Sequence, residues 1–165
     1  MKFTCTYTQN EKLLRQYYYN VKMSGVRKWL WLGLLLIAGS AALYLYHRDP
    51  LDLVFLVLGV SYGIKELSAP YRAAKKELDG LTEKYGQNLP QTTVTVDEQK
   101  AVSSFDMEQI SLPLENVLGL YFCKDCIVLK GYSEDIILAM DGLENVEEIK
   151  GFLKKYCKNA PVYKR

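Results

Sequence analysis

Two long apolar runs separated by four residues constrain this chain more than any other feature. Residues 29–46 (WLWLGLLLIAGSAALYLY) contain no charged side chain, and as a helix they would be about 27 Å long. This length approaches the roughly 30 Å hydrocarbon core of a bilayer. The second run, residues 51–64 (LDLVFLVLGVSYGI), is shorter and carries one aspartate. We expect both runs to be transmembrane helices that form a hairpin in a lipid bilayer.

The linker between the runs, HRDP at 47–50, contains the His-Arg-Asp tripeptide of a protein-kinase catalytic loop. A kinase loop also needs an asparagine about five residues after the aspartate, and a glycine-rich loop and a strand lysine far upstream. Residue 54 is Val54, and 46 residues precede His47. Pro50 suits the first turn of a helix. The pattern therefore predicts a turn between two helices, with no catalytic role for Asp49.

The residues that flank the two runs predict the orientation of the hairpin. Aromatic side chains, which are enriched at membrane interfaces, lie at or near the ends of the runs: Trp29, Trp31, Tyr44, Tyr46 and Tyr62. Five lysines and arginines lie shortly before the hairpin, five lie shortly after it, and only Arg48 lies between the helices. Because basic residues are retained on the cytoplasmic side, this distribution predicts a multi-pass protein of the cell membrane with both termini cytoplasmic. The alternatives are a helical hairpin buried in a soluble protein and a cleaved signal peptide.

The remaining sequence divides into three parts around the hairpin. Residues 1–28 predict a strand, KFTCTYT, with Phe3, Cys5 and Tyr7 on one face, and then an amphipathic helix opened by a capping box of Thr8 and Glu11. Residues 65–90 predict a basic juxtamembrane helix that begins at Pro70. Residues 91–165 predict a separate cytoplasmic domain.

That last segment contains six short strand-like runs between residues 91 and 140, followed by an amphipathic helix from about Glu144 to Lys158. Six strands and a terminal helix predict an antiparallel half-barrel similar to a pleckstrin-homology (PH) domain, plugged by the helix. We expect the strand with Phe3, Cys5 and Tyr7 to pair with this distant sheet, because a lone strand is unstable. The predicted fold class is an α+β membrane protein whose transmembrane hairpin is inserted between an N-terminal strand and helix and a C-terminal PH-like half-barrel.

In this organisation the chain resembles the YcxB-like membrane proteins of bacteria. The resemblance rests on FTCTYTQNEKLLRQYYY before the hairpin, on ISLPLENVLGLYF and CIVLKGYSEDIILAM after it, and on the last amphipathic helix. It implies a two-helix hairpin joined to a C-terminal PH-like domain of unassigned activity. Leu114 stands where the family pattern leads us to expect tryptophan. The resemblance supplies no catalytic residue.

The sequence offers no constellation for catalysis and no complete metal site, so we predict no catalytic, cofactor-binding or metal-binding residues and no cofactor. Cys123 and Cys126 are spaced like half of a zinc knuckle, but zinc needs four ligands and no second pair exists. We expect two apolar cysteines beside a Lys-Asp turn, with zinc or redox chemistry as the alternative.

Charge is distributed unevenly along the chain, and it guides the functional prediction. Residues 91–149 carry three lysines against twelve acids, a net charge of −9, which disfavours anionic lipid headgroups and nucleic acid as ligands. We predict a non-catalytic interaction module that the hairpin anchors at the cytoplasmic face and that binds a protein or peptide. The alternatives are a small pore or transport protein and an enzyme. Small residues around Gly33 and Gly39 also permit association between copies of the chain.

Overall fold

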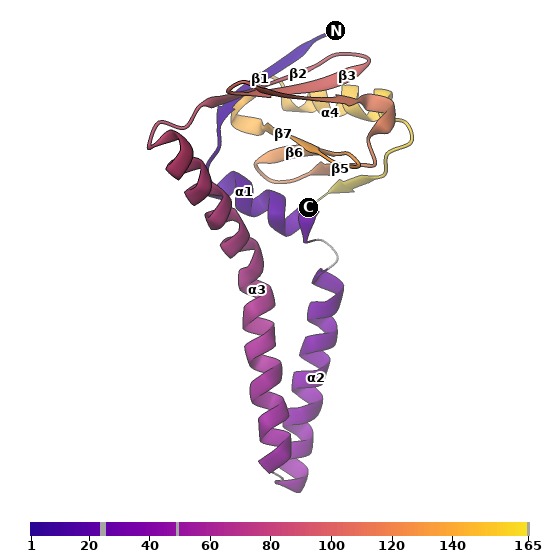
Figure 1. Cartoon of the computed structure of the whole chain (residues 1–165). Helices are drawn as coiled ribbons and strands as arrows, with labels where there is room; N and C mark the ends of the chain where they lie inside the picture. Colours follow the sequence, from indigo (N-terminus) through magenta and orange to yellow (C-terminus); the bar gives the residue numbers. More distant parts are fainter. Residues whose placement is uncertain (24–25, 49, 165) are drawn as a thin grey trace.

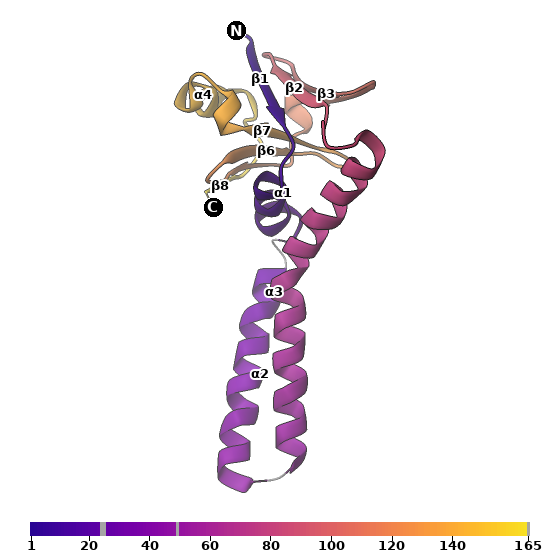
Figure 2. The ribbon, with the colours of Figure 1, turned by 90° about the vertical axis from the view of Figure 1, so that its left-hand side faces the viewer.

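The computed structural model describes residues 1–23, 26–48 and 50–164, with the side chains of all of these except 26–30, 32 and 52. It has two regions (Figures 1 and 2). A globular part, residues 1–23 and 68–164, contains every strand in the described residues. A narrow stalk, residues 26–48 and 50–67, consists of two helices that lie side by side. Both chain termini lie on the globular part (Figure 1).

The strands form two four-stranded sheets. The first sheet has the order β1-β2-β3-β4 and is antiparallel; its strands are β1 (Phe3–Thr8), β2 (Gln91–Val96), β3 (Lys100–Phe105) and β4 (Glu108–Pro113). The second sheet has the order β7-β6-β5-β8; its strands are β5 (Gly119–Phe122), β6 (Cys126–Lys130), β7 (Asp135–Ala139) and β8 (Val162–Lys164). The six runs predicted after residue 90 correspond to β2 to β7, which confirms them as strands.

The predicted pairing of the N-terminal strand with the distant sheet is confirmed. Strand β1 pairs antiparallel with β2, from Phe3 opposite Val96 to Thr8 opposite Gln91. Its buried side chains also reach the second sheet, because the Cys5 thiol donates to the Ala139 carbonyl at 3.2 Å and the Tyr7 hydroxyl donates to the Ile137 carbonyl at 2.9 Å. The first sheet therefore combines the N-terminal strand with strands of the predicted domain at residues 91–165.

The predicted single PH-like half-barrel is wrong, since the strands form two sheets. The chain leaves the first sheet at Pro113, which has no N–H to donate, and enters a 3-10 turn, η2 (Leu114–Asn116). The Leu114 amide donates to the Gln99 carbonyl at 2.8 Å, and β5 then starts the second sheet. This second sheet is mixed, because the unpredicted strand β8 pairs in parallel with β5, placing Val162 opposite Leu120.

The remaining helices of the globular part cover the sheets. Helix α4 (Val146–Tyr156) follows a second 3-10 turn, η3 (Met140–Gly142), and buries Ile149, Phe152 and Leu153. Helix α1 (Glu11–Tyr17) continues into a π-helical segment, η1 (Tyr18–Lys22). The predicted capping box at Thr8 is wrong, because Asn10 is the N-cap and accepts a hydrogen bond from the Leu13 amide at 2.9 Å. Asparagine is among the strongest N-cap residues, and here it lies directly before the first helical residue.

The stalk helices are α2 (Val26–His47) and α3 (Pro50–Tyr85), and the predicted pair of transmembrane helices is wrong. Among the described residues, one helical stretch, Leu53–Tyr85, is long and apolar enough to cross a membrane by length and composition. The other apolar helical stretch among the described residues is Gly33–His47 of α2. The chain is an α+β protein with one long apolar helix and two sheets.

We predicted that Pro70 begins a separate helix, but it lies inside α3. The axis of α3 changes direction where the stalk meets the globular part (Figure 2), as expected where proline removes a backbone hydrogen bond. Pro50 is the first residue of α3, in agreement with the prediction. The far end of α3 packs against α1 and η1, so a single helix belongs to both regions.

Candidate functional site

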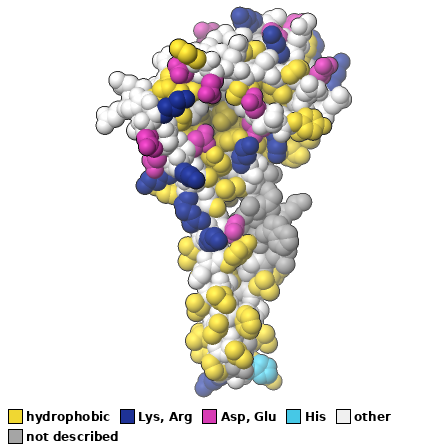
Figure 3. All heavy atoms as spheres, in the orientation of Figure 1, with side chains coloured by type: hydrophobic (Ala, Val, Ile, Leu, Met, Phe, Trp, Pro, Cys, Tyr) yellow, Lys and Arg dark blue, Asp and Glu magenta, His cyan; other side chains and the backbone are white. Residues whose placement is uncertain are grey.

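The stalk exposes the largest apolar surface of the described chain. Only 6% of the most apolar window of α3 is buried inside the protein. The large apolar side chains exposed on the two helices are Leu34, Leu35, Leu36, Leu43, Leu45, Leu51, Leu53, Val54, Phe55, Val57, Leu58, Val60, Ile64 and Leu67. Figure 3 shows hydrophobic side chains along the stalk down to its tip. This exposure contradicts a hairpin buried in a soluble protein, and a surface of this kind marks contact with a membrane or another protein.

Inside the stalk, the helices touch at a glycine that the sequence analysis did not single out. A Cβ added at Gly59 of α3 would lie 3.0 Å from Ile37 Cγ1 of α2, and one added at Gly63 would lie 3.9 Å from Ile37 Cδ1. Gly59 and Gly63 form the small-xxx-small spacing that lets helices approach closely. No described atom lies within 4 Å of a Cβ added at Gly33 or Gly39. That these glycines pack between copies of the chain stays a prediction.

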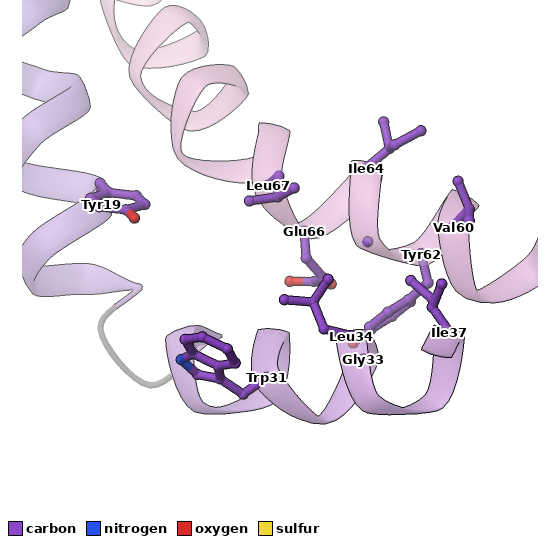
Figure 4. A pocket seen from close by; sticks show the side chains of 11 residues that line it. Tyr19, Trp31, Gly33, Leu34, Ile37, Val60, Tyr62, Ile64, Glu66 and Leu67 are labelled. Carbon is purple, nitrogen blue, oxygen red and sulfur yellow. The ribbon is translucent and has the colours of Figure 1, made fainter. Parts of the chain in front are cut away.

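A groove of about 450 Å³ lies between α2 and α3 on the side of the globular part. Figure 4 shows Glu66 of α3 pointing into this groove, which Leu34 and Trp31 of α2 also line. The other lining side chains are mainly apolar and include Ile37, Val60 and Ile64. The groove is therefore an extension of the apolar stalk surface, with one carboxylate at its upper end.

A belt of basic side chains follows the apolar stretch of α3. Lys65, Arg72, Lys75 and Lys76 are all exposed (Figure 3). The Arg72 guanidinium donates to Ser68 Oγ at 2.6 Å and to the Lys65 carbonyl at 2.7 Å, so it lies back along the helix. This basic belt lies where the stalk meets the globular part, as expected of residues at a lipid headgroup layer.

On the globular part, β4 is an edge strand with a groove beside it. The groove measures about 200 Å³ and is lined by Ile110, Ser111 and Pro113 of β4 and by Tyr132, Ser133 and Glu134 of the turn between β6 and β7. Tyr132 is 87% exposed. An edge strand beside a groove with an exposed aromatic side chain is a typical place for an extended segment of another protein to add as a strand.

Two tyrosines of the YYY run at residues 17–19 pack in or against the core and donate to carboxylates, whereas Tyr19 is exposed. Tyr17 is buried and donates to Asp135 Oδ2 at 2.8 Å, while Tyr18 donates to Glu77 Oε2 at 2.5 Å. Burial, followed by the hydrogen bond to Asp135, raises the pKa of Tyr17 far above its ordinary value. Burial, followed by the hydrogen bond to Glu77, raises the pKa of Tyr18 to about 12. Both hydroxyls therefore stay protonated and act as donors.

The kinase-like tripeptide forms the tip of the stalk. His47 is the last residue of α2, and its ring packs edge-to-face on Tyr46 with ring centroids 4.8 Å apart. The Arg48 amide donates to the Tyr44 carbonyl at 2.8 Å, and Arg48 has a φ of 53°. This backbone ends the helix, in agreement with the predicted turn. Asp49 lies outside the described residues.

Cys123 and Cys126 lie in the core beside the turn between β5 and β6, as predicted, with 4% and 0% of their surface exposed. The hydrogen bond with Cys123, followed by burial, raises the pKa of Cys126 far above its ordinary value, which leaves a neutral thiol. No group of three or more potential metal ligands occurs among the described residues.

Helix α1 fixes the turn between these cysteines through contacts that no sequence pattern predicts. Lys12 forms an ion pair with Asp125 Oδ2 at 3.0 Å, and the Asp125 amide donates to Gln16 Oε1 at 3.0 Å. The Gln16 side-chain amide also donates to Asp125 Oδ2. This contact ties the N-terminal helix to the second sheet.

Comparison with known proteins gave no match to a protein family model, to a curated protein or to a solved structure. The functional assignment therefore depends on the surfaces described above.

Proposed function

We propose that this chain is a membrane-anchored, non-catalytic interaction protein. The apolar stretch of α3 anchors the chain in a lipid bilayer, and the globular part stays at the cytoplasmic face and binds a protein or peptide. The observation that carries the proposal is the exposure of the apolar stretch of α3, which no other part of the described chain covers. The YcxB-like resemblance of the sequence fits this function, and membership of that family is likewise a proposal.

The dimensions and charges of the stalk support membrane insertion. Residues 51–67 of α3 extend about 25 Å along the helix, which is close to the thickness of a bilayer core. Lys65 lies near the end of this stretch, and Arg72, Lys75 and Lys76 follow it, at the height of the lipid headgroups. Lysine and arginine near the end of an apolar helix extend their charged groups toward the interface. The basic residues that flank the stalk favour the cytoplasmic side for both termini.

The proposed membrane anchor is tested by extraction and by cysteine labelling. The native chain should stay in the membrane fraction after alkaline carbonate washing. A cysteine placed at Tyr132, which is 87% exposed, should react with a membrane-impermeant thiol reagent only after the cells are permeabilised. The native chain is the control, because its four cysteines are buried. Labelling of Tyr132→Cys in intact cells would contradict the cytoplasmic orientation, and release by carbonate would contradict insertion.

For the partner, we propose a basic segment that adds as a strand to β4. Residues 91–149, which include most of the strands, carry a net charge of −9. Exposed Glu134 lines the groove beside β4, and exposed Glu108 is the first residue of that strand. Opposite charge favours a basic partner and speeds its association. A photoreactive residue in place of Ser111 should crosslink to that partner in membranes, and mass spectrometry would identify it.

The terminal helix offers the matched control for this crosslinking. A second groove beside α4 is lined by Lys155, Lys158 and Asn159, so its charge has the opposite sign. A photoreactive residue in place of the exposed Lys158 should give no crosslink to the same partner. Crosslinking from Lys158 alone would move the binding surface to α4 and contradict the assignment to β4.

A further inference from the structure

A polar cleft opens between the two sheets and the far end of α3, apart from the stalk and the groove beside β4. Its volume is about 290 Å³. The first sheet contributes Tyr7, Thr92 and Ile110, the second contributes Ile137, and α3 contributes Leu81 and Lys84. Ile110 also lines the groove beside β4, so the cleft and that groove meet at one residue of the edge strand.

Two buried polar atoms at this cleft lack a hydrogen-bond donor among the described residues. They are Oγ1 of Thr92, a residue with 2% of its surface exposed, and Oε1 of Gln9. A hydrogen bond from the Thr92 hydroxyl to the Tyr7 oxygen lowers the pKa of Tyr7, although burial raises that pKa overall. Tyr7 donates its own hydrogen to Ile137, so Thr92 Oγ1 still lacks a donor for its lone pairs. Buried polar groups are almost always hydrogen-bonded, so these two atoms indicate a group that occupies the cleft. Gln9 Oε1 accepts only, so that group must be a donor.

The charges around the cleft favour a cation. Glu77, Glu108 and Asp135 line it, against the single base Lys84. Lys84 lies over the Tyr85 ring, 4.8 Å from its centroid, at the exposed rim. Lys22, outside the lining, lies 3.7 Å from Asp135 and compensates part of its charge. The balance stays negative, so an anion would be repelled, and a neutral apolar molecule would leave both polar atoms unpaired.

The walls of the cleft suit an aliphatic stem behind the charged group. Leu81, Phe105, Ile110 and Ile137 supply apolar surface on several sides. Basic side chains pack their methylene stems on such surfaces while the charged end meets its acceptors. Glu77 and Asp135 already accept from Tyr18 and Tyr17, which fixes both carboxylates in place. An arginine or lysine side chain has this combination of stem and donors.

We propose that the cleft binds an alkylguanidinium or alkylammonium group, supplied by an arginine or lysine of the basic segment that adds to β4. This inference deepens the proposed function and rests on it for the source of the cation. A free alkylamine presents the same chemistry, and the two sources differ in whether the backbone of the ligand pairs with β4. The first contact is the carboxylate of Glu77, and Thr92 and Gln9 supply the further acceptors.

The test uses the full chain in detergent micelles, with amide chemical shifts followed by nuclear magnetic resonance. The probes are N-acetyl-arginine amide, its neutral isostere N-acetyl-citrulline amide, and agmatine, an alkylguanidinium without a peptide backbone. The arginine probe should shift the amides of Thr92, Ser103 and Ile137 saturably, and the citrulline probe should not. Additional shifts along β4 with the arginine probe but not with agmatine would identify a peptide as the source. Equal binding of agmatine without shifts along β4 would overturn that source.

Two variants and a matched control separate binding from structure. Glu77→Gln should weaken binding of the arginine probe by about tenfold or more, whereas Glu144→Gln, an exposed carboxylate away from the cleft, should leave it unchanged. Thr92→Val should weaken binding by about two- to tenfold and leave the melting temperature equal or higher, because it removes a buried hydroxyl whose oxygen lacks a donor. A merely structural Thr92 would instead lower the melting temperature and leave binding unchanged.

Two results would overturn the inference. Equal binding of the citrulline and arginine probes would show that charge is not recognised, and unshifted cleft amides with every probe would show that the cleft holds water only. Either result would leave membrane retention and crosslinking from Ser111 intact, so it would not bear on the proposed function. Release of the native chain by carbonate would refute the membrane anchor, while the micelle measurement would still stand.

Discussion

The stalk and the globular part use the same apolar residues in opposite ways. In the globular part, Leu129 and Ile136 are 0% exposed, whereas in the stalk Leu35 and Leu58 are 70% and 59% exposed. The contact between the two stalk helices lies at a small residue, Gly59. The globular part is stabilised by its own core, and the stalk depends on what surrounds it. Substitutions should therefore affect the two regions in different ways.

The largest effect should come from removing residues 1–8. The deletion takes away β1, and with it the buried Cys5 and Tyr7 and their hydrogen bonds to the second sheet. We expect the globular part to lose its cooperative unfolding transition and to become sensitive to protease, while the stalk stays in the membrane. Limited proteolysis of membranes would measure this difference. Unchanged amide exchange in residues 91–160 would contradict the role of β1.

The matched substitutions Leu129→Ala and Leu35→Ala compare the regions directly. Leu129→Ala removes a fully buried side chain and should lower the free energy of unfolding by about 2–5 kcal/mol. Leu35→Ala changes an exposed side chain and should change it by less than about 0.5 kcal/mol in micelles. Chemical denaturation of the purified protein, followed by near-ultraviolet circular dichroism, measures both. Equal losses would show that the stalk has a core of its own.

A larger side chain at Gly59 should separate the stalk helices. Gly59→Leu places atoms where Ile37 already lies, because even an added Cβ would be 3.0 Å from Ile37 Cγ1, and overpacking of this kind costs about 1–3 kcal/mol. Distances between spin labels on α2 and α3 should increase. Gly39→Leu is the control, since no described atom lies within 4 Å of a Cβ there. If Gly39→Leu changed the distances and Gly59→Leu did not, the observed contact would be wrong.

The N-cap of α4 should contribute a smaller amount to the globular part. The Asn145 side chain accepts from the Glu148 amide at 3.3 Å, and Asn145→Ala should lower the free energy of unfolding by about 1 kcal/mol. Asn145→Asp keeps an acceptor at this position and should restore most of the loss. Thermal unfolding in micelles measures both variants, and a cap without effect would appear as identical melting temperatures for the native chain and Asn145→Ala.

The smallest effect should be a loss of stability at mildly alkaline pH, near pH 9. Burial raises the pKa of the Cys5 and Cys157 thiols from 9.0 to about 11. The folded state keeps both thiols neutral, while the unfolded chain ionises them at lower pH. Their stabilising contribution is thus complete below about pH 8.5 and is lost as pH rises toward 11. At pH 9 the loss should stay below about 1 kcal/mol per thiol.

Unfolding of the native chain and of Cys157→Ala between pH 7 and 11 measures this dependence. Removing Cys157 should flatten the alkaline part of the profile. Equal slopes for the two proteins would show that the Cys157 thiol does not contribute.

Strong local patterns made much of the fold predictable. Strands β2 to β7 follow apolar runs between turn residues, and α4 has its apolar stripe, with acids at its start and lysines at its end. The pairing of β1 was predictable because the alternation of Phe3, Cys5 and Tyr7 requires a partner strand. The tip of the stalk followed from the four-residue linker and Pro50.

The rest depends on contacts that no local pattern encodes. Strand β8 has three residues and forms because it pairs with the edge of β5. The Leu120 amide of β5 donates to the carbonyl of Pro161, the residue before β8, at 2.9 Å. Two membrane-crossing helices were predicted because the run 29–46 is apolar throughout, whereas one helical stretch of the described residues, Leu53–Tyr85, is long and apolar enough to cross a membrane. The polar cleft is assembled from strands of both sheets and from α3, so Thr92 and Gln9 could not be linked from sequence.

The pairing of β1 with β2 sets the order of events during synthesis. Residues 9–90 lie between these paired strands, and a ribosome needs about 4 to 16 s to add them. Throughout that time β1 is without its partner strand, whereas α2 is already complete. In the proposed membrane-anchored form, insertion of the apolar stretch of α3 therefore precedes closure of the first sheet. The N-terminal strand must be kept from aggregating until β2 arrives, and a slow ribosome lengthens this exposure.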